Sequence, residues 1–496
     1  MRLEIKDKLH VLLFVIILIL SIGFRLVYLD QPMKHDEAAT FNNFASKSMF
    51  QISVDYYSSN NHIFHSIFVH LSYLLFGKDE IFIRFPAFIF GILSILSIYF
   101  LARKILDRNV ALLSMLLLSV SQFFINYSSE ARGYTLAVFL SILTVYFIFE
   151  ALKTEKLKFW LISAVLVSLT MYTIPSMFYF FLGISVWVIF VKAKKLSRNQ
   201  KFKNPLLFLL LSGFITTVLY MPILIFTGIN LISPLSNIYV SPFIVTFDEF
   251  ITKSPLYAIE TIETFSLGIT SYVFLVVFVL LGYYFLYKEK SYDKLILFLS
   301  LPIITILAII IQMVLPPIRI FIFLLPFFCM LVAKGILNLV DFVVSLRDIF
   351  SKYQLNKILP ILILIVFLIQ GVSANLLTEK HFPHDSEEAA EWLKANLRTG
   401  DSLLVYSSED EQIKYYTGQE VYSQYENIKS NVSRIVMVVN PSKHEQVDEF
   451  VEYKFQIRGA SEFELLKKIG RLDVYQSTKL EFIYTEEDCP GVWIYE

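Results

Sequence analysis

The sequence predicts a polytopic α-helical membrane protein with a C-terminal α/β domain, and three observations support this fold class. Of the 496 residues, 56% are hydrophobic and 16% aromatic, and the mean hydropathy is +0.61. That exceeds what the core of a soluble protein needs. The apolar residues form continuous runs of about 20 residues, the length of a helix that crosses a bilayer. After residue 375 the composition changes abruptly toward Glu, Lys, Ser and Asp.

The apolar runs predict about eleven transmembrane helices. Continuous runs, rather than ten-residue alternation, exclude a membrane β-barrel. A signal peptide is the alternative for the first run, but this run continues past Ser21-Ile22-Gly23 to Leu29, which favours a retained span. The predicted spans lie near residues 10–28, 81–102, 109–126, 133–151, 157–174, 176–192, 205–227, 269–287, 294–315, 319–338 and 358–375.

Basic residues predict the orientation, because Lys and Arg collect in cytoplasmic loops. They occupy every second turn, whereas the opposite short loops carry almost none. The N-terminus is therefore expected in the cytoplasm, and the tail and the long loops 29–80 and 228–268 outside it. The basic turns contain Arg103, Lys104 and Arg108; Lys153, Lys156 and Lys158; Lys192 to Lys203; Lys288, Lys290 and Lys294; and Arg347, Lys352 and Lys357.

The charge and cysteine content narrow the possible partners. The formal net charge is zero, with 43 basic and 43 acidic residues, so nothing suggests a nucleic-acid partner. Cys329 falls in a predicted span and Cys489 in the tail, too far apart for a disulfide. Membrane lipids and molecules outside the cytoplasm are the expected partners. The Lys-, Ile- and Phe-rich composition favours a prokaryotic cytoplasmic membrane, although an endoplasmic reticulum protein would share this topology.

Two domains follow from these patterns. Residues 1–375 form the membrane domain, in which loop 29–80 contains a helix in "DEAATFNNFASKSM" and a short apolar helix in "HIFHSIFVHLSYLLFG", both expected at the membrane interface. Residues 376–496 form the α/β domain. Its predicted helices are 386–397, 409–418 and 442–455, and its predicted strands are 402–408, 434–440, 471–486 and 491–496.

Ionisable residues on the predicted outer side are the candidates for function. Asp36 and Glu37 could act as a general base or hold a divalent cation, but interfacial carboxylates near a helix N-terminus are also common for structural reasons. His62 could bind a metal ion or relay a proton, although a lone histidine is more often an ordinary polar residue. Further candidates are Glu130 and three arginines that could bind a lipid phosphate, Arg84, Arg132 and Arg319; for Arg84 snorkelling to the head groups is an equal alternative.

Four segments together resemble the GT-C glycosyltransferases that use lipid-phosphate-linked sugars, such as protein O-mannosyltransferases and lipid A aminoarabinose transferases. The segments are "HDEAATF", "NNHIFHSIFVHLSYLLFG" followed by "IRFPAFIFGILSI", "YSSEARGYTLAVF" and "PPIRIFIFLLPFF". The resemblance covers residues 10–375. It implies a GT-C fold, a catalytic role for Asp36 and Glu37, and substrate-binding roles for His62, Arg84, Glu130, Arg132, Tyr134 and Arg319.

The resemblance implies an inverting transferase that moves a hexose or pentose from a polyprenyl-phosphate donor to a protein, lipid or glycan acceptor outside the cytoplasm. A divalent metal ion is an open option, with Glu37 and His62 as candidate ligands, but loop 228–268 has no histidine to complete such a site. Two alternatives remain. A transporter or flippase of lipid-linked sugars would place ionisable residues at mid-membrane depth, and a non-catalytic binder would share the fold.

Overall fold

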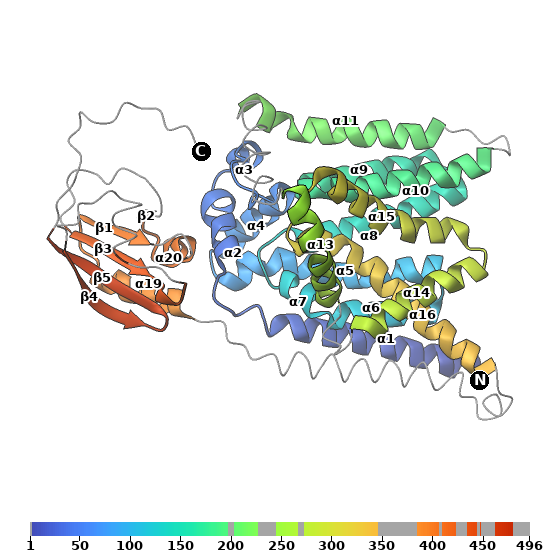
Figure 1. The fold of residues 1–496 in the computed structure, drawn as a ribbon, viewed down its shortest axis with the longest axis horizontal. Helices are drawn as coiled ribbons and strands as arrows, with labels where there is room; N and C mark the ends of the chain where they lie inside the picture. The colour runs from blue at the N-terminus through green and yellow to red at the C-terminus, as the bar shows by residue number, and fades with distance from the viewer. Residues whose placement is uncertain are drawn as a thin grey trace. The chain divides into compact units, whose positions relative to one another are not determined.

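The chain divides into two units that do not follow the order of the sequence (Figure 1). The helical unit comprises Met1–Asp30 and Phe44–Glu379, and the C-terminal unit comprises Gln31–Asn43 and Lys380–Glu496. The computed structural model describes residues 2–196, 203–226, 245–265, 272–345, 384–405, 409–422, 434–443, 447 and 462–479. Sequence composition indicated a single boundary at 375, and it could not show that part of the first loop joins the tail.

The helical unit is a bundle of apolar helices that correspond to ten of the predicted spans. By length and hydropathy, seven described helices could cross a membrane, or eight if the bent pair α6–α7 is one span. The eleventh predicted span, 358–375, lies outside the described residues. The helices are α1 (Arg2–Leu26), α5 (Glu80–Ile105), α6 (Arg108–Val120), α7 (Gln122–Ser128), α8 (Tyr134–Thr154), α9 (Leu157–Thr173), α10 (Phe178–Leu196), α11 (Lys203–Phe226), α14 (Tyr272–Lys288), α15 (Tyr292–Gln312) and α16 (Leu325–Ser345).

Two predicted spans prove short. Helix α9 has 17 residues, which at 1.5 Å per residue gives about 25 Å, less than the ~30 Å of a bilayer core. The apolar part of α14 is shorter still, Leu275–Lys288. Both spans were predicted from hydropathy, and hydropathy does not determine the residue at which a helix begins or ends. The count of eleven spans therefore stays a prediction.

The predicted span 109–126 is broken. Helices α6 and α7 meet at 65° across Ser121. The Ser121 hydroxyl accepts a hydrogen bond from the Phe124 N–H, which caps the start of α7. After the break, the short helix α7 ends at Ser128. The loop with the "SEARGY" residues begins directly after it.

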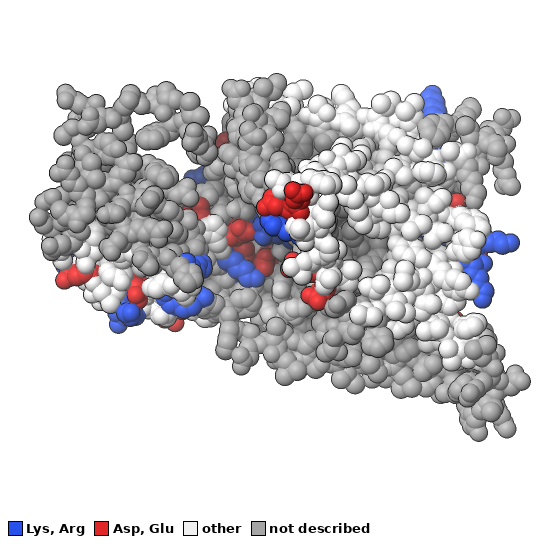
Figure 2. Space-filling view, viewed as in Figure 1, with Lys and Arg blue, Asp and Glu red and all other residues white. Residues whose placement is uncertain are grey.

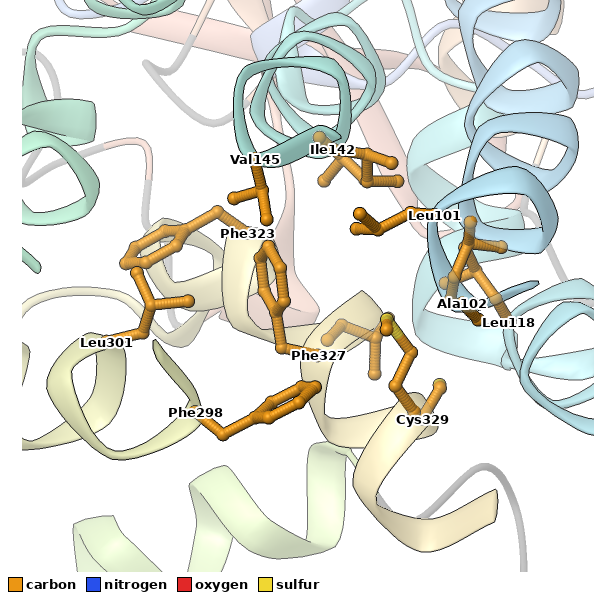
Figure 3. Close-up of a cluster of buried hydrophobic side chains, with 14 of the residues drawn as sticks. Leu101, Ala102, Leu118, Ile142, Val145, Phe298, Leu301, Phe323, Phe327 and Cys329 are labelled. Carbon is orange, nitrogen blue, oxygen red and sulfur yellow. The ribbon is translucent and has the colours of Figure 1, made fainter. Parts of the chain in front are cut away.

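A continuous apolar core holds the bundle together. Figure 3 shows part of it, with side chains contributed by α5, α6, α8, α15, the 3₁₀ segment η6 (Ile318–Leu324) and α16. Cys329, predicted to lie inside a span, is fully buried in this core. On the face seen in Figure 2, a broad uncharged surface lies between basic side chains at one end and charged side chains over α13 (Phe247–Thr264).

Ion pairs join turns that the sequence placed on one side of the membrane. Lys104 pairs with Glu150, and Lys192 with Glu155. Lys334 in α16, near the end of the predicted span 319–338, lies 2.7 Å from Glu289, which follows α14. These contacts agree with the alternation predicted for the turns, because residues predicted on the same side touch. Which side faces the cytoplasm remains a prediction.

The first loop contains four short elements rather than two helices. They are α2 (His35–Thr40), the π-helix η1 (Phe41–Ala45), α3 (Met49–Val54) and α4 (Ile63–Phe76), with Gly77 at the C-cap of α4 as predicted. The first predicted helix, 36–49, is therefore split. In the second long loop the described helix is the amphipathic α13, whose first turn carries Asp248 and Glu249.

The described part of the C-terminal unit is a five-stranded mixed sheet of order β2-β1-β3-β5-β4. Strand β1 (Asp401–Val405) pairs parallel with β2 (Val421–Tyr422) and β3 (Arg434–Val439); β5 (Leu472–Lys479) pairs antiparallel with β3 and β4 (Glu462–Ile469). Apolar residues of α19 (Asp385–Asn396) and α20 (Asp410–Thr417) pack together with sheet residues in one core.

The predicted helices α19 and α20 and the strands β1, β3 and β5 are confirmed. Edge strand β4 was missed, because charged residues such as Lys467 and Lys468 interrupt its apolar pattern, as is common at sheet edges. The predicted helix 442–455 lies largely outside the described residues, and the predicted strand 491–496 lies outside them entirely.

Substitution of Asp401 tests the packing of this sheet. Arg434 Nε lies 3.2 Å from each carboxylate oxygen, and Asp401 is opposite Arg434 in the β1–β3 register. Burial alone would raise the pKa of Asp401, but hydrogen bonds from Arg434 and the Arg398 N–H, with the attraction of Arg434, lower this pKa. We expect Asp401→Asn to destabilise the unit by about 2 kcal/mol. Limited proteolysis of the full-length protein measures this, and unchanged resistance would contradict it.

Candidate active site

The acidic pair lies on α2, in the C-terminal unit. Glu37 is buried, and its Oε2 accepts a hydrogen bond from the Lys34 N–H at 3.1 Å, as a carboxylate at the third helical position often does. Asp36 is different, because 38% of its side chain remains exposed. The structure therefore gives Glu37 a helix-capping position and leaves Asp36 as the more accessible carboxylate.

His35 lies between two carboxylates of the same unit. Its Nε2 is 3.0 Å from Asp410 Oδ1, and its Nδ1 is 3.8 Å from Asp36 Oδ1. Burial alone would lower the pKa of His35, but hydrogen bonds and charge attraction from Asp36 and Asp410 raise this pKa to about 10. A protonated His35 therefore keeps a positive charge beside Asp36 at neutral pH.

The helical unit brings the "NNH" and "SEARGY" segments together. His62, the N-cap residue of α4, accepts a hydrogen bond at Nδ1 from the Gly133 N–H at 2.8 Å. The His62 ring also meets the Tyr134 ring edge to face, with centroids 5.0 Å apart. With Nδ1 acting as acceptor, the neutral ring carries its proton on Nε2. His62 thus presents a donor rather than a lone pair, which argues against the metal-binding role considered for it.

The two asparagines before His62 also have separate tasks. Asn61 is buried, and its amide donates to the carbonyl oxygens of Ile52 and Asp55 at 3.0 and 2.8 Å, which fixes the connection between α3 and α4. Asn60 accepts a hydrogen bond from Arg132 Nη1. Asn60 and His62 therefore hold the loop that contains the predicted phosphate ligand, and Asn61 between them fixes the segment that carries both.

Arg132 and Arg319 both lie within electrostatic reach of Tyr127. The Tyr127 hydroxyl lies within electrostatic reach of Glu130, Tyr134, Arg319 and Arg132, and its ring is 4.6 Å from the Tyr134 ring. The Arg132 guanidinium carbon lies 5.8 Å from the Tyr134 centroid. Four predicted substrate-binding residues therefore lie within electrostatic reach of one tyrosine. We call Tyr127, Glu130, Arg132, Tyr134 and Arg319 the cationic cluster.

Arg84 lies elsewhere in the helical unit. Its side chain is fully buried, and Nη1 donates to the Leu29 carbonyl oxygen at 2.8 Å. A snorkelling arginine would keep its head group in water, so the burial of Arg84 argues against that alternative. The observed contact ties α5 to the end of the first span, directly before residues 31–43.

His65 is not among the predicted substrate-binding residues, yet it lies within electrostatic reach of Arg132. Its ring is fully buried, and neither ring nitrogen has a hydrogen-bond partner among the described residues. Burial, with the positive charge of Arg132, lowers the pKa of His65 to about 3. A neutral, buried histidine thus lies close to Arg132 of the cationic cluster. Tyr127 and Asn60 were also missed, since tyrosine and asparagine are too common to stand out.

The described residues include no cluster of side chains that is ready to bind a divalent metal ion. No group of three or more His, Cys, Asp or Glu side chains close enough to hold a metal ion occurs among the described residues. Nδ1 of His62 and Oε2 of Glu37 already take part in the hydrogen bonds described above, and the use of a metal ion stays a prediction. We therefore derive no step that uses a metal ion.

The arrangement of bundle, broken helix, loop helices and C-terminal sheet defines the class: the chain has the GT-C fold. It is similar to ArnT from Cupriavidus metallidurans, solved with undecaprenyl phosphate, with a TM-score of 0.60, 11% identity, and coverage of 93% of this chain and 97% of that one. It is also similar to the Archaeoglobus fulgidus oligosaccharyltransferase tethered to an acceptor peptide, with a TM-score of 0.51, 12% identity, and coverage of 87% and 69%.

Sequence comparisons match smaller parts of the chain. Residues 62–226 match the family described as dolichyl-phosphate-mannose-protein mannosyltransferase. This stretch includes His62, Arg84 and the "SEARGY" residues, but neither Asp36 nor Arg319. An uncharacterized protein of Aquifex aeolicus (strain VF5) is 32% identical over 152 residues, 29% of this chain and 30% of that protein. The matched stretch thus spans less than a third of this relative.

Substitution of Gly133 tests the contact between the two segments. A Cβ atom there would lie 2.8 Å from Thr173 Cγ2 and 2.9 Å from His62 Cβ. We expect Gly133→Ala to destabilise the protein by about 1–3 kcal/mol, seen as a lower melting temperature in detergent. Gly213→Ala in α11 is the control, because no atom lies within 4 Å of a Cβ there. Equal effects of both substitutions would contradict this packing.

The pH dependence of stability tests the His35 contacts. Because the folded pKa is raised, the contribution of His35 is complete below pH 6.5 and is lost as the pH rises through about 10. The difference in melting temperature between wild type and His35→Gln should therefore shrink from pH 6 to pH 10.5. Asp410→Asn should reduce the same difference. A constant difference across this range would show that His35 does not titrate as described.

Proposed function

We propose that this protein is an inverting membrane glycosyltransferase that moves a sugar from a polyprenyl-phosphate donor to an acceptor hydroxyl on the extracytoplasmic side. The observation that carries the proposal is that Arg132 and Arg319 both lie within electrostatic reach of Tyr127 in a chain with the GT-C fold. Two guanidinium groups in a largely apolar bundle suit a lipid phosphate, which arginine binds through paired hydrogen bonds. ArnT from Cupriavidus metallidurans, which shares the fold, binds undecaprenyl phosphate.

In the proposed reaction a carboxylate acts on the acceptor, and two arginines act on the leaving phosphate. The acceptor oxygen attacks the anomeric carbon while the bond from that carbon to the phosphate oxygen breaks, and the polyprenyl phosphate leaves with the electron pair. Asp36, the more accessible carboxylate of α2, takes the proton of the acceptor hydroxyl. Arg132 and Arg319 stabilise the charge that develops on the phosphate. Since phosphate is a good leaving group, the mechanism needs no second carboxylic acid of the kind that glycosidases use.

The neighbours of these groups support the assigned roles. Tyr134 and Asn60 orient Arg132, and His62 holds the backbone of the same loop through Gly133. Glu130, like both arginines, lies within electrostatic reach of Tyr127, and its negative charge would offset part of theirs when no phosphate is present. Glu37 keeps α2 folded by capping its first turn. The donor sugar, hexose or pentose, and the acceptor class are left for experiment.

The test compares wild type with Asp36→Asn in lipid nanodiscs. Release of polyprenyl phosphate is measured from undecaprenyl-phosphate mannose and undecaprenyl-phosphate aminoarabinose, with a membrane extract as acceptor. We expect Asp36→Asn to reduce release by about 10²-fold or more, since a general base is lost. Asp248→Asn is the matched control, because Asp248 also lies in the first turn of a helix, α13.

The outcomes separate the candidate functions. Equal release by wild type and Asp36→Asn would exclude Asp36 from the mechanism. No release by wild type, with the labelled donor still bound, would instead favour a carrier or a non-catalytic binder of lipid-linked sugars.

A further inference from the structure

The C-terminal unit holds the helix that carries Asp36. Residues 31–43 cluster with the tail rather than with the neighbouring parts of the first loop. Helix α2 packs on α20. It has only six residues, and a helix this short is not stable in water without packing partners. The direction in which α2 presents Asp36 therefore depends on what packs against it.

Glu411 makes the most direct contacts to this segment. Its Oε2 accepts a hydrogen bond from Asn42 Nδ2 at 2.8 Å, and its Oε1 accepts one from Asn43 Nδ2 at 2.7 Å. The Asn42 amide also donates to the Glu411 carbonyl oxygen at 2.9 Å. Both carboxylate oxygens thus bind consecutive amides at the point where α2 becomes the π-helix η1.

Acidic residues in the first turn of α20 have an ordinary explanation, because they offset the helix dipole. Asp410 fits that explanation in part, since its Oδ1 accepts a hydrogen bond from the Glu411 N–H, although the same oxygen also lies 3.0 Å from His35 Nε2. The offset of the helix dipole does not account for the Glu411 carboxylate, because its two oxygens accept hydrogen bonds from the side chains of Asn42 and Asn43. A charged acceptor also strengthens each of these hydrogen bonds.

Aromatic contacts flank the carboxylate. Tyr415, one helical turn after Glu411, meets the Phe41 ring edge to face with centroids 5.4 Å apart. The Tyr416 hydroxyl accepts a hydrogen bond from the Met33 N–H at 2.8 Å. Helix α20 therefore contacts the chain at both ends of α2, at Met33 before its first residue and at Phe41 after its last.

We propose that Glu411 is a positioning residue for the transfer reaction: through Asn42 and Asn43 it holds the helix that carries Asp36 in the orientation that the reaction needs. This inference rests on the proposed function and gives the C-terminal unit a role in it. Glu411 acts through α2 and touches no reacting atom itself. Its loss should therefore lower kcat and leave the KM for the lipid donor nearly unchanged.

The test uses full-length wild type, Glu411→Ala and Glu411→Gln in nanodiscs. The control is Glu391→Ala, because Glu391 is an exposed glutamate on α19 of the same unit. Amide hydrogen exchange of residues 35–43 and transfer from the more active of the two undecaprenyl-phosphate donors are measured. For Glu411→Ala we expect about tenfold faster exchange and a kcat lower by about tenfold or more.

The Gln variant separates positioning from a general effect of charge. Its side-chain oxygen can accept from one asparagine, but its amide group faces the donor of the other. Glu411→Gln should therefore fall between wild type and Glu411→Ala in both measurements, while Glu391→Ala matches wild type.

The two measurements distinguish failure of this inference from failure of the proposed function. Unchanged exchange in Glu411→Ala overturns the inference whatever the activity. Faster exchange with unchanged kcat in an active enzyme overturns it too. If wild type transfers no sugar, the proposed function fails and the positioning role with it, and the exchange data then report only whether Glu411 holds the segment.

Discussion

The hydrogen bond from the Gly133 N–H to His62 Nδ1 is the interaction on which the cationic cluster depends. It joins two loops at the point where each enters a helix, α4 on one side and α8 on the other. The same two loops are joined by the hydrogen bond from Arg132 to Asn60. The absence of a side chain at residue 133 allows the approach, so a backbone constraint determines where two functional side chains lie.

An apolar bundle tolerates few polar groups, and many of those in this bundle have a definite partner. Buried serine and threonine hydroxyls donate to backbone carbonyls one turn earlier, as Ser114 and Ser141 do. Basic residues of the predicted cytoplasmic turns pair with glutamates. Against this background Arg132 and Arg319 both lie within electrostatic reach of Tyr127. Such a concentration of charge is costly in an apolar setting, which is why it suggests an anionic ligand.

The sequence predicted the fold class, the bundle, and most of the C-terminal sheet, because hydropathy and strand patterns are local properties. It also selected Arg132 and Arg319 as candidates, since charged residues near span ends are conspicuous, and the family resemblance added Tyr134; their roles stay predictions. It could not show the break at Ser121, because a capped bend leaves hydropathy unchanged. Nor could it reveal that Asn42 and Asn43 contact Glu411, because pairing across 369 and 368 positions leaves no trace in a single sequence.

That separation has a consequence for the order in which the protein is made. Asn42 emerges from the ribosome 369 residues before Glu411, which at 5–20 residues per second is roughly 20 to 70 s. Throughout that interval the first loop exists without α20, and α2 lacks the packing that a six-residue helix requires. The bundle can insert span by span before α2 acquires its packing partner α20. The helix that carries Asp36 is therefore completed among the last parts of the molecule, although its residues are among the first to be synthesised.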